Sequence, residues 1–232
     1  MTHEVKIHEA QTAILRELLF VPAASFSELQ KKTNLESDHF KFHIARLVEV
    51  GYVEKRSDRG YVLTVSGKEY ANKLDTDQNA IERQPKSAVI IVLEDGDLVL
   101  IQERLKHPYF GFWGYPGGKI RWGETILTAA ARELKEETGL EADLQYRGVY
   151  HEHVRSAETG EILEDKIFHI VSAHSPSGDL FENFEGGRNA WMSFAKLATV
   201  EKKYTSTDIE TKIGLGEDSF VESEQTYTKE EF

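Results

Sequence analysis

Glutamates are concentrated in one segment of the sequence, GGKIRWGETILTAAARELKEETGL, which runs from Gly117 to Leu140. A glycine turn there precedes a predicted helix, and the candidate functional set is Glu124, Arg132, Glu133, Glu136 and Glu137. Because residues three and four positions apart are neighbours on a helix, the last three glutamates are expected on one face. Carboxylates that lie so near one another raise each other's pKa unless a cation lies among them. Since Mg2+ binds carboxylate oxygens beside substrate phosphates, the spacing predicts a magnesium site.

A solvated acidic helix is the simpler alternative, with Lys135 pairing to Glu133 or Glu136. The pattern is more specific than that. It resembles the Nudix signature, and every fixed position of that signature is filled: Gly118, Glu124, Arg132, Glu133, Leu134, Glu136, Glu137, Gly139 and Leu140. The resemblance implies a mixed β-sheet between helices and Mg2+-dependent hydrolysis, with Mn2+ as a substitute. It also implies as substrate a nucleoside triphosphate or a nucleoside diphosphate linked to another group.

The resemblance also assigns roles to residues. The implied metal ligands are Glu133, Glu136, Glu137 and the carbonyl group of Gly117. Arg132 is expected to orient a neighbouring carboxylate, and Glu124 to assist at the metal. Glu136 is also expected to take part in catalysis. The general base is open among three residues outside the signature: Glu185, Glu161 and Glu164.

Four residues are predicted to bind substrate. Arg104 and Lys119 could reach phosphates, and Phe110 or Trp113 could stack on a base, although each has an ordinary surface or core alternative. The loop GFWGYPGG resembles that of the branch that hydrolyses oxidised nucleoside triphosphates. Arg155 and Ser156 stand where the ADP-sugar branch has a proline, and the tyrosine of the dinucleoside polyphosphate branch is missing, which disfavours both branches without excluding them.

Composition limits the kinds of binding site and the cellular location that the chain can be expected to have. The chain has 232 residues, no cysteine and a net charge of −12, so disulfides and thiolate-bound zinc are excluded. Residues 86–232 carry 16 Lys+Arg against 27 Asp+Glu, which argues against a nucleic-acid surface there. The histidines at 151, 153, 169 and 174 are expected to be structural or solvated. The start of the chain lacks a leader pattern and no long apolar run follows, so a cytoplasmic protein without membrane contact is expected.

The N-terminal residues have a different pattern. Apolar spacing predicts helices over 8–19, from Ser25 onwards and over 37–51, then a hairpin over 52–65 and a helix over 66–74. This order resembles a winged helix-turn-helix domain, assigned to residues 1–75. The resemblance places a set of residues on DNA: Ser37, His39, Lys41 and His43 with Arg46 on the third helix, and Arg56 and Arg59 with Lys55 on the wing. A docking or dimerisation module is the alternative, and the near-neutral charge of this part favours it.

The whole chain is therefore predicted to be an α+β protein. Residues 76–86 are expected to be a linker, 87–200 the Nudix domain and 201–232 an acidic tail with at most a short helix near 206–214. The leading functional hypothesis is a Nudix pyrophosphohydrolase with a DNA-binding module. The other is a transcriptional regulator whose Nudix domain senses a nucleotide such as ADP-ribose. A homodimer is a further expectation, because both domain types often dimerise.

Overall fold

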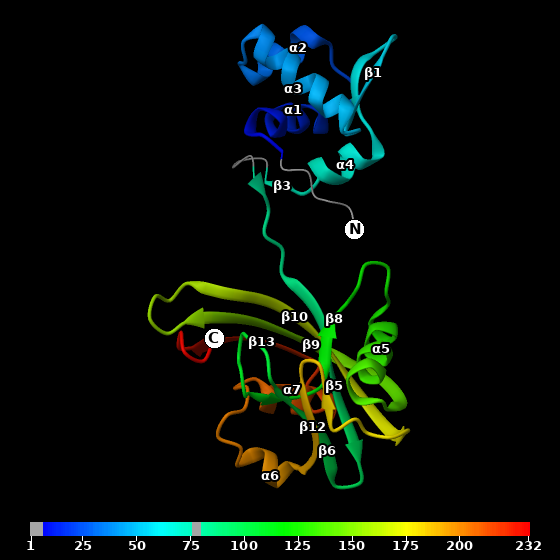
Figure 1. Ribbon diagram of the computed structural model, residues 1–232, viewed down its shortest axis with the longest axis vertical. Coiled ribbons are helices and arrows are strands. Elements are labelled where there is room, and N and C mark those ends of the chain that lie inside the picture. Colours follow the sequence, from blue (N-terminus) through cyan, green and yellow to red (C-terminus); the bar gives the residue numbers. More distant parts are fainter. Residues whose placement is uncertain (1–6, 76–79) are drawn as a thin grey trace. The chain divides into compact units, whose positions relative to one another are not determined.

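The computed structural model describes residues 7–75 and 80–232 (Figure 1). The chain divides into two compact units, Met1–Arg83 and Gln84–Phe232. We describe each unit by itself. In the described residues, no helix has both the length and the apolar character needed to cross a membrane.

The described residues of the N-terminal unit form helices and short paired strands. The helices are α1 (Glu9–Leu19), α2 (Phe26–Thr33), α3 (Ser37–Glu49) and α4 (Val65–Ala71), and the strands are β1 (Val53–Arg56), β2 (Gly60–Leu63), β3 (Leu74–Asp75) and β4 (Ala80–Ile81). Strand β1 pairs with β2 and β3 with β4, each antiparallel. Ser25 and Glu28 begin α2 with a capping box, as their spacing predicts.

The core of this unit comes from the apolar faces of its helices. Ile14 and Leu15 of α1 pack with Leu29 of α2 and with Phe40 and Leu47 of α3. The predicted order of three helices, a hairpin and a further helix is confirmed. Val48 of α3 is 39% exposed, because the buried stripe of this helix ends with Leu47. The last helix ends at Ala71 instead of residue 74.

The C-terminal unit is built on a mixed sheet whose strands follow the order β11-β12-β6-β5-β10-β9-β13. The long strands are β5 (Lys86–Asp95), β6 (Leu98–Arg104), β9 (Glu141–Ser156), β10 (Ile162–Ser177), β12 (Gly187–Ser193) and β13 (Phe220–Tyr227). The short strands are β7 (Trp113–Gly114), β8 (Gly117–Lys119) and β11 (Asn183–Phe184). Strand β10 is parallel to β5, and β13 is parallel to β9, whereas β9 and β10 are antiparallel. The mixed sheet predicted from the signature is confirmed.

Helices cover both faces of this sheet. They are α5 (Ile126–Thr138), α6 (Phe194–Ala198) and α7 (Thr207–Gly214). Ala130 and Leu134 of α5 pack on Val89 and Ile91, whereas Ile213 of α7 packs with side chains of the other face. In Figure 1, α5 and α7 accordingly lie on opposite sides of the central strands.

The segment after residue 200 differs from the acidic tail that its composition suggests. Helix α7 coincides with the short helix expected there, but Phe220–Tyr227 then forms the strand β13. This strand pairs with β9 from Val149 to Ser156, and Tyr227 is buried. The segment is therefore part of the sheet. Its acidic side chains gave no sign of this because one face of an edge strand remains in water.

Candidate active site

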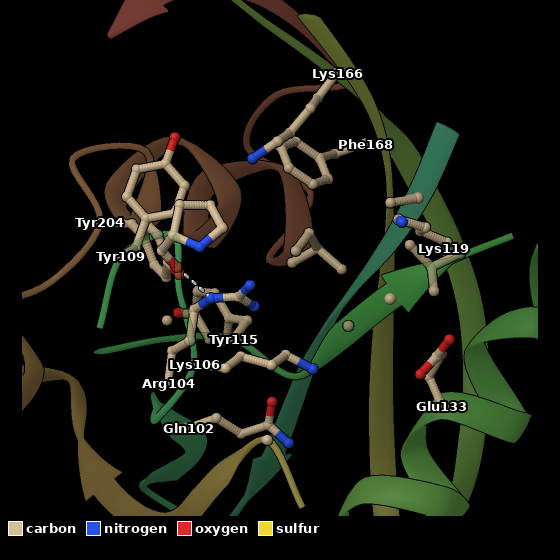
Figure 2. Close-up of a pocket in the computed structure, with 18 of the residues that line it drawn as sticks. Gln102, Arg104, Lys106, Tyr109, Tyr115, Lys119, Glu133, Lys166, Phe168 and Tyr204 are labelled. Carbon is tan, nitrogen blue, oxygen red and sulfur yellow. Dashed lines mark hydrogen bonds between the residues drawn. The ribbon is translucent and has the colours of Figure 1, made fainter. Parts of the chain in front are cut away.

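A pocket of about 640 Å³ opens in the C-terminal unit. Its walls come from β5, β6, β8, β9, β10, α5 and α7. Figure 2 shows how Glu133 of α5 faces a space that is also bordered by Lys106, Lys119 and Arg104. The pocket thus combines acidic side chains on one helix with cationic side chains from other elements. Such a combination suits a ligand that carries both a cation and phosphates.

Helix α5 is fixed in direction by its caps and its apolar face. The Thr125 hydroxyl accepts a hydrogen bond from the Thr128 amide, and Gly139 ends the helix with φ of 77°. Ala129, Ala130 and Leu134 are buried against the sheet. Because Leu134 faces the sheet, its neighbour Glu133 and the following Glu137 reach the pocket wall.

The absence of a side chain at Gly118 leaves space for the Glu133 carboxylate. A Cβ atom at this glycine would lie 2.3 Å from the Glu133 carboxyl carbon. Any other residue would therefore displace either β8 or the carboxylate. The glycine at this signature position has a direct physical reason, which is close approach between β8 and the helix side chain.

Arg132 holds three carboxylates together. Its Nε and Nη2 atoms donate to the two oxygens of Glu124 at 2.6 and 2.8 Å. Its Nη1 donates to Glu133 at 2.7 Å and to Glu136 at 3.2 Å. This fork lowers the pKa of Glu124 to about 2. The Arg132 guanidinium is therefore a cation that relieves the crowding of these three carboxylates.

Glu137 differs from the other three acids. The pKa of its carboxyl is raised to about 7, because burial and the charge of Glu133 outweigh the opposing effects of the Gln102 amide, Lys106 and Arg104. Among the described residues, no ion pair involves Glu137. A buried carboxyl without such a partner is one that gains from a cation.

Glu136 lies apart from the pocket. Its side chain is 48% exposed and accepts from Arg121 at 2.9 Å as well as from Arg132. Of the three candidate bases, Glu161 and Glu185 are exposed, and only Glu164 lines the pocket. Glu164 is already engaged, since Tyr109 donates to it at 2.9 Å and Lys166 contacts it.

The four predicted substrate residues divide into two pairs. Arg104 and Lys119 line the pocket, although the Arg104 guanidinium also donates to the carbonyl of Pro108 at 2.6 Å. Phe110 and Trp113 do not line it. Phe110 is 47% exposed, and Trp113 packs beside Arg188. The prediction that these two aromatic rings stack on a base therefore finds no support in their positions.

Sequence reasoning missed the deeper wall of the pocket. This wall is formed by Tyr109, Glu152, Lys166, Phe168, Tyr204 and Glu210. These residues come from two loops, two strands and α7, so that no local motif joins them. Alternation along the strands was the available signal, because every second residue of β9 from Tyr150 to Val154 is buried.

The residues predicted to contact DNA belong to the N-terminal unit. Ser37, His39, Lys41 and Arg46 are exposed on α3, as the prediction requires. His43 is 3% exposed, so its assignment to a base edge is wrong. It stacks on His8 with ring centroids 4.6 Å apart. Its position in the sequence matched the exposed stripe, but the N-terminus of α1 covers it.

The hairpin β1–β2 carries the predicted phosphate contacts. Lys55, Arg56 and Arg59 are exposed there. Arg56 donates to Glu54 at 2.5 Å, and Arg59 donates to Asp58 at 2.9 Å. Each arginine therefore already has an acidic neighbour, which weakens the positive potential of this hairpin.

Solved structures with a similar fold are known. One is the MutT protein from Bacillus halodurans, with a TM-score of 0.51 and 24% identity, matched over 62% of this chain and 92% of that one. Another is the NUDIX domain of Shewanella oneidensis NrtR complexed with ADP ribose, with a TM-score of 0.51 and 18% identity, over 67% and 99% of the two chains. At these identities, the two structures show a shared fold.

Comparison of the sequence with known proteins identifies more than the fold. The chain is 30% identical over 128 residues to the ADP-ribose pyrophosphatase of Methanocaldococcus jannaschii, which is 53% of this chain and 76% of the relative. The model of the NUDIX domain matches residues 83–211. This range includes α5 with its glutamates and most of the pocket wall. The chain therefore belongs to the NUDIX family of pyrophosphohydrolases.

Proposed function

We propose that this enzyme hydrolyses the diphosphate of a nucleoside diphosphate linked to a second group, with Mg2+ bound at Glu133 and Glu137. The observation that carries the proposal is the position of these two carboxylates. They line the same pocket as Lys106, Lys119 and Arg104. A diphosphate that enters this pocket would meet cationic side chains from β6 and β8 and a metal site on α5.

The donor set fits Mg2+. Glu133 and Glu137 offer carboxylate oxygens, and Gly117 lies in the facing wall of the pocket with a backbone carbonyl. Glu136 remains a third candidate ligand, whose carboxylate would exchange Arg121 for the cation. Bound Mg2+ would supply charge neutralisation at the diphosphate and activation of water. Arg132 would keep Glu133 in place throughout, since it holds that carboxylate at 2.7 Å.

The other groups of the pocket would position the substrate. The Gln102 amide is buried in the pocket wall beside the Glu137 carboxyl, so it would orient this metal ligand next to the substrate. The rings of Phe168 and Tyr204 border the deeper part, where a base or a second sugar could pack. The volume of about 640 Å³ lies within the usual range for small-molecule sites.

We assign the general base to Glu185. It lies in the turn between β11 and β12, between Phe184 and Gly186, which both line the pocket. Among the described residues, no ion pair involves Glu185, so its carboxylate is available to accept a proton. Glu164 is less suitable, because Tyr109 and Lys166 engage its oxygens.

ADP-ribose is the first substrate to test, because a relative with 30% identity is named ADP-ribose pyrophosphatase. Glu137→Gln should lower kcat at least about 100-fold, which is the upper end of losses at metal-site residues. Release of phosphorylated products in Mg2+ measures this, with nucleoside triphosphates as competing substrates. Glu201→Gln, at an exposed position outside the pocket, is the matched control. Unchanged kcat in Glu137→Gln would refute the ligand assignment.

A second candidate function is nucleotide sensing coupled to DNA binding. It is favoured by the three helices and hairpin of the N-terminal unit, which we propose to be a winged helix-turn-helix domain. A sensor binds its nucleotide without needing turnover. Tight binding of ADP-ribose by the wild-type chain, with no hydrolysis of any nucleotide in Mg2+ or Mn2+, would select this function over the first.

A further inference from the structure

The outer face of the sheet carries a second group of potential metal ligands. Residues alternate between the two faces of a strand. On β9, Glu152 lines the pocket, so His151 and His153 point to the opposite face. On β10, Glu164 lines the pocket, and Asp165 likewise points away from it. The pairing of β9 with β10 sets Asp165 directly beside His153. Two imidazoles and one carboxylate therefore converge away from the active site.

The distances in this group suit a small cation. His151 Nε2 lies 2.9 Å from Asp165 Oδ1, and His153 Nε2 lies 3.6 Å from Asp165 Oδ2. All three candidate ligand atoms lie within 4.8 Å of one another. Ligands around a tetrahedral zinc ion at about 2.0–2.2 Å are separated by roughly 3.3–3.6 Å. Small rotations of the side chains would bring the three atoms to that separation.

Glu222 of β13 provides an independent observation. It lies 2.9 Å from His151 Nδ1, which is the ring nitrogen facing away from Asp165. A histidine that binds metal through one nitrogen usually donates its other N–H to a carboxylate, which fixes the tautomer and the ring plane. His151 has this arrangement already. The next outward carboxylate of β13, Glu224, is engaged by Arg155 at 2.7 Å, so it does not compete for the site.

We propose that His151, His153 and Asp165 form a Zn2+ site on the outer face of the sheet, with Glu222 orienting His151. Two imidazoles and a carboxylate are a ligand set of zinc, whereas Mg2+ takes oxygen ligands. The three side chains are 23%, 33% and 38% exposed, which leaves the fourth position open to water or to an external ligand. The proposal does not rest on the proposed function, because the pocket lies on the other face.

The site has a structural consequence for the sheet. Its ligands belong to β9 and β10, and its orienting carboxylate belongs to β13. Bound Zn2+ would therefore tie the C-terminal strand to the two long strands (Figure 1). Glu222 lies beyond residues 83–211, the range that the family model matches. The orienting group thus comes from a part of this chain that the family match does not include.

Zinc titration of the full chain by calorimetry tests the proposal, with millimolar Mg2+ present to occupy the carboxylates of α5. We expect one Zn2+ equivalent at this site, and at least about tenfold weaker binding in His151→Ala and in His153→Ala. Glu222→Gln should weaken binding by roughly tenfold while leaving one equivalent bound, a smaller loss than in the double variant His151→Ala, His153→Ala, as expected of a positioning residue.

Two controls make the outcome decisive. His169→Ala removes a histidine of β10 outside the group and should leave Zn2+ affinity unchanged. Thermal unfolding of each variant in a chelator should match that of the wild type, which excludes misfolding as the cause of lost affinity. Wild-type Zn2+ affinity in the double variant His151→Ala, His153→Ala would overturn the proposal. So would an equal loss of affinity in His169→Ala.

Discussion

The guanidinium of Arg132 makes the glutamates of α5 compatible with a folded helix. It contacts Glu124, Glu133 and Glu136, so three negative charges share one rigid cation. Its side chain is only 14% exposed, which limits screening of these contacts by water. Glu137 is the acid outside this network, and it lines the pocket. The network therefore holds Glu133 in place and leaves Glu137, which has no ion pair among the described residues, available to the cation.

Arg132→Lys tests this network at the level of one residue. Lysine keeps the charge but cannot hold Glu124 bidentately and Glu133 at the same time. We expect kcat/KM for the best nucleotide substrate to fall by roughly 10-fold to 100-fold. Arg121→Lys is the matched control, because the Arg121 guanidinium contacts only Glu136 among the described residues. Equal activity of the two variants would contradict the role given to Arg132.

The site residues that could be predicted are those joined by a continuous motif. Glu133, Glu137 and Gly117 line the pocket as expected, because helical spacing and one glycine turn fix their relative places. The aromatic residues could not be chosen in the same way. Trp113 and Tyr115 are two large aromatic residues only two positions apart, yet of the two only Tyr115 lines the pocket. Which ring turns inward depends on strands distant in the sequence.

At the scale of elements, α7 is distinguished by a buried acid. Glu210 is 4% exposed, and the Ser206 hydroxyl donates to it at 3.0 Å. Burial raises the pKa of Glu210 to about 8, and the nearby carboxylate of Glu152 adds to the effect. Burial also raises the pKa of Glu152 itself. Deprotonation of the Glu210 carboxyl therefore destabilises the folded state.

Unfolding experiments across pH test this acid. The pKa of Glu210 is raised above its unfolded value of about 4.5, so its contribution to stability is fully present below pH 4.5 and is lost as pH rises toward 8. The free energy of unfolding should fall by up to about 1.4 kcal/mol per pH unit in that window. Glu210→Gln should flatten this slope when measured by urea unfolding.

The matched control for this slope is Glu217→Gln, which changes an exposed glutamate shortly after α7. This variant should keep the wild-type dependence of stability on pH. A slope in Glu210→Gln as steep as that of the wild type would show that other groups cause it.

Elements with local signals were predictable, and those fixed by distant pairing were not. Helix α5 follows from its apolar spacing and from Gly139, and α2 follows from its capping box. Strand β13 was missed, because its residues alternate weakly and carry three acidic or amide side chains: Glu222, Glu224 and Gln225. It is a strand because β9, more than sixty residues earlier, offers a free edge.

At the scale of the whole molecule, the two units differ in net charge. Residues 1–85 carry 12 Lys+Arg against 13 Asp+Glu, whereas residues 86–232 carry most of the net charge of −12. DNA is therefore repelled least by the N-terminal unit. The exposed cations of α3, Lys41 and Arg46, are the best candidates for phosphate contacts there, although Arg46 also pairs with Glu49 at 2.7 Å.

Salt dependence tests the DNA-binding proposal. If Lys41 contacts a phosphate, binding of the full chain to duplex DNA should weaken with salt, and Lys41→Ala should reduce the slope of log K against log salt by about 1. Fluorescence anisotropy over a range of salt concentrations measures both effects. Lys68→Ala, exposed on α4, is the matched control and should keep the wild-type slope. Absent or salt-insensitive binding would favour a docking module instead.

The three consecutive residues His151, Glu152 and His153 have a consequence for how this protein can change in evolution. Along β9, His151 and His153 at odd positions are partly exposed to solvent, whereas Glu152 at the even position between them is buried. A single inserted or deleted residue before His151 would move the imidazoles into the cavity and the acid out of it. Viable changes in the length of this strand are therefore restricted to steps of two, unless a bulge absorbs the odd residue.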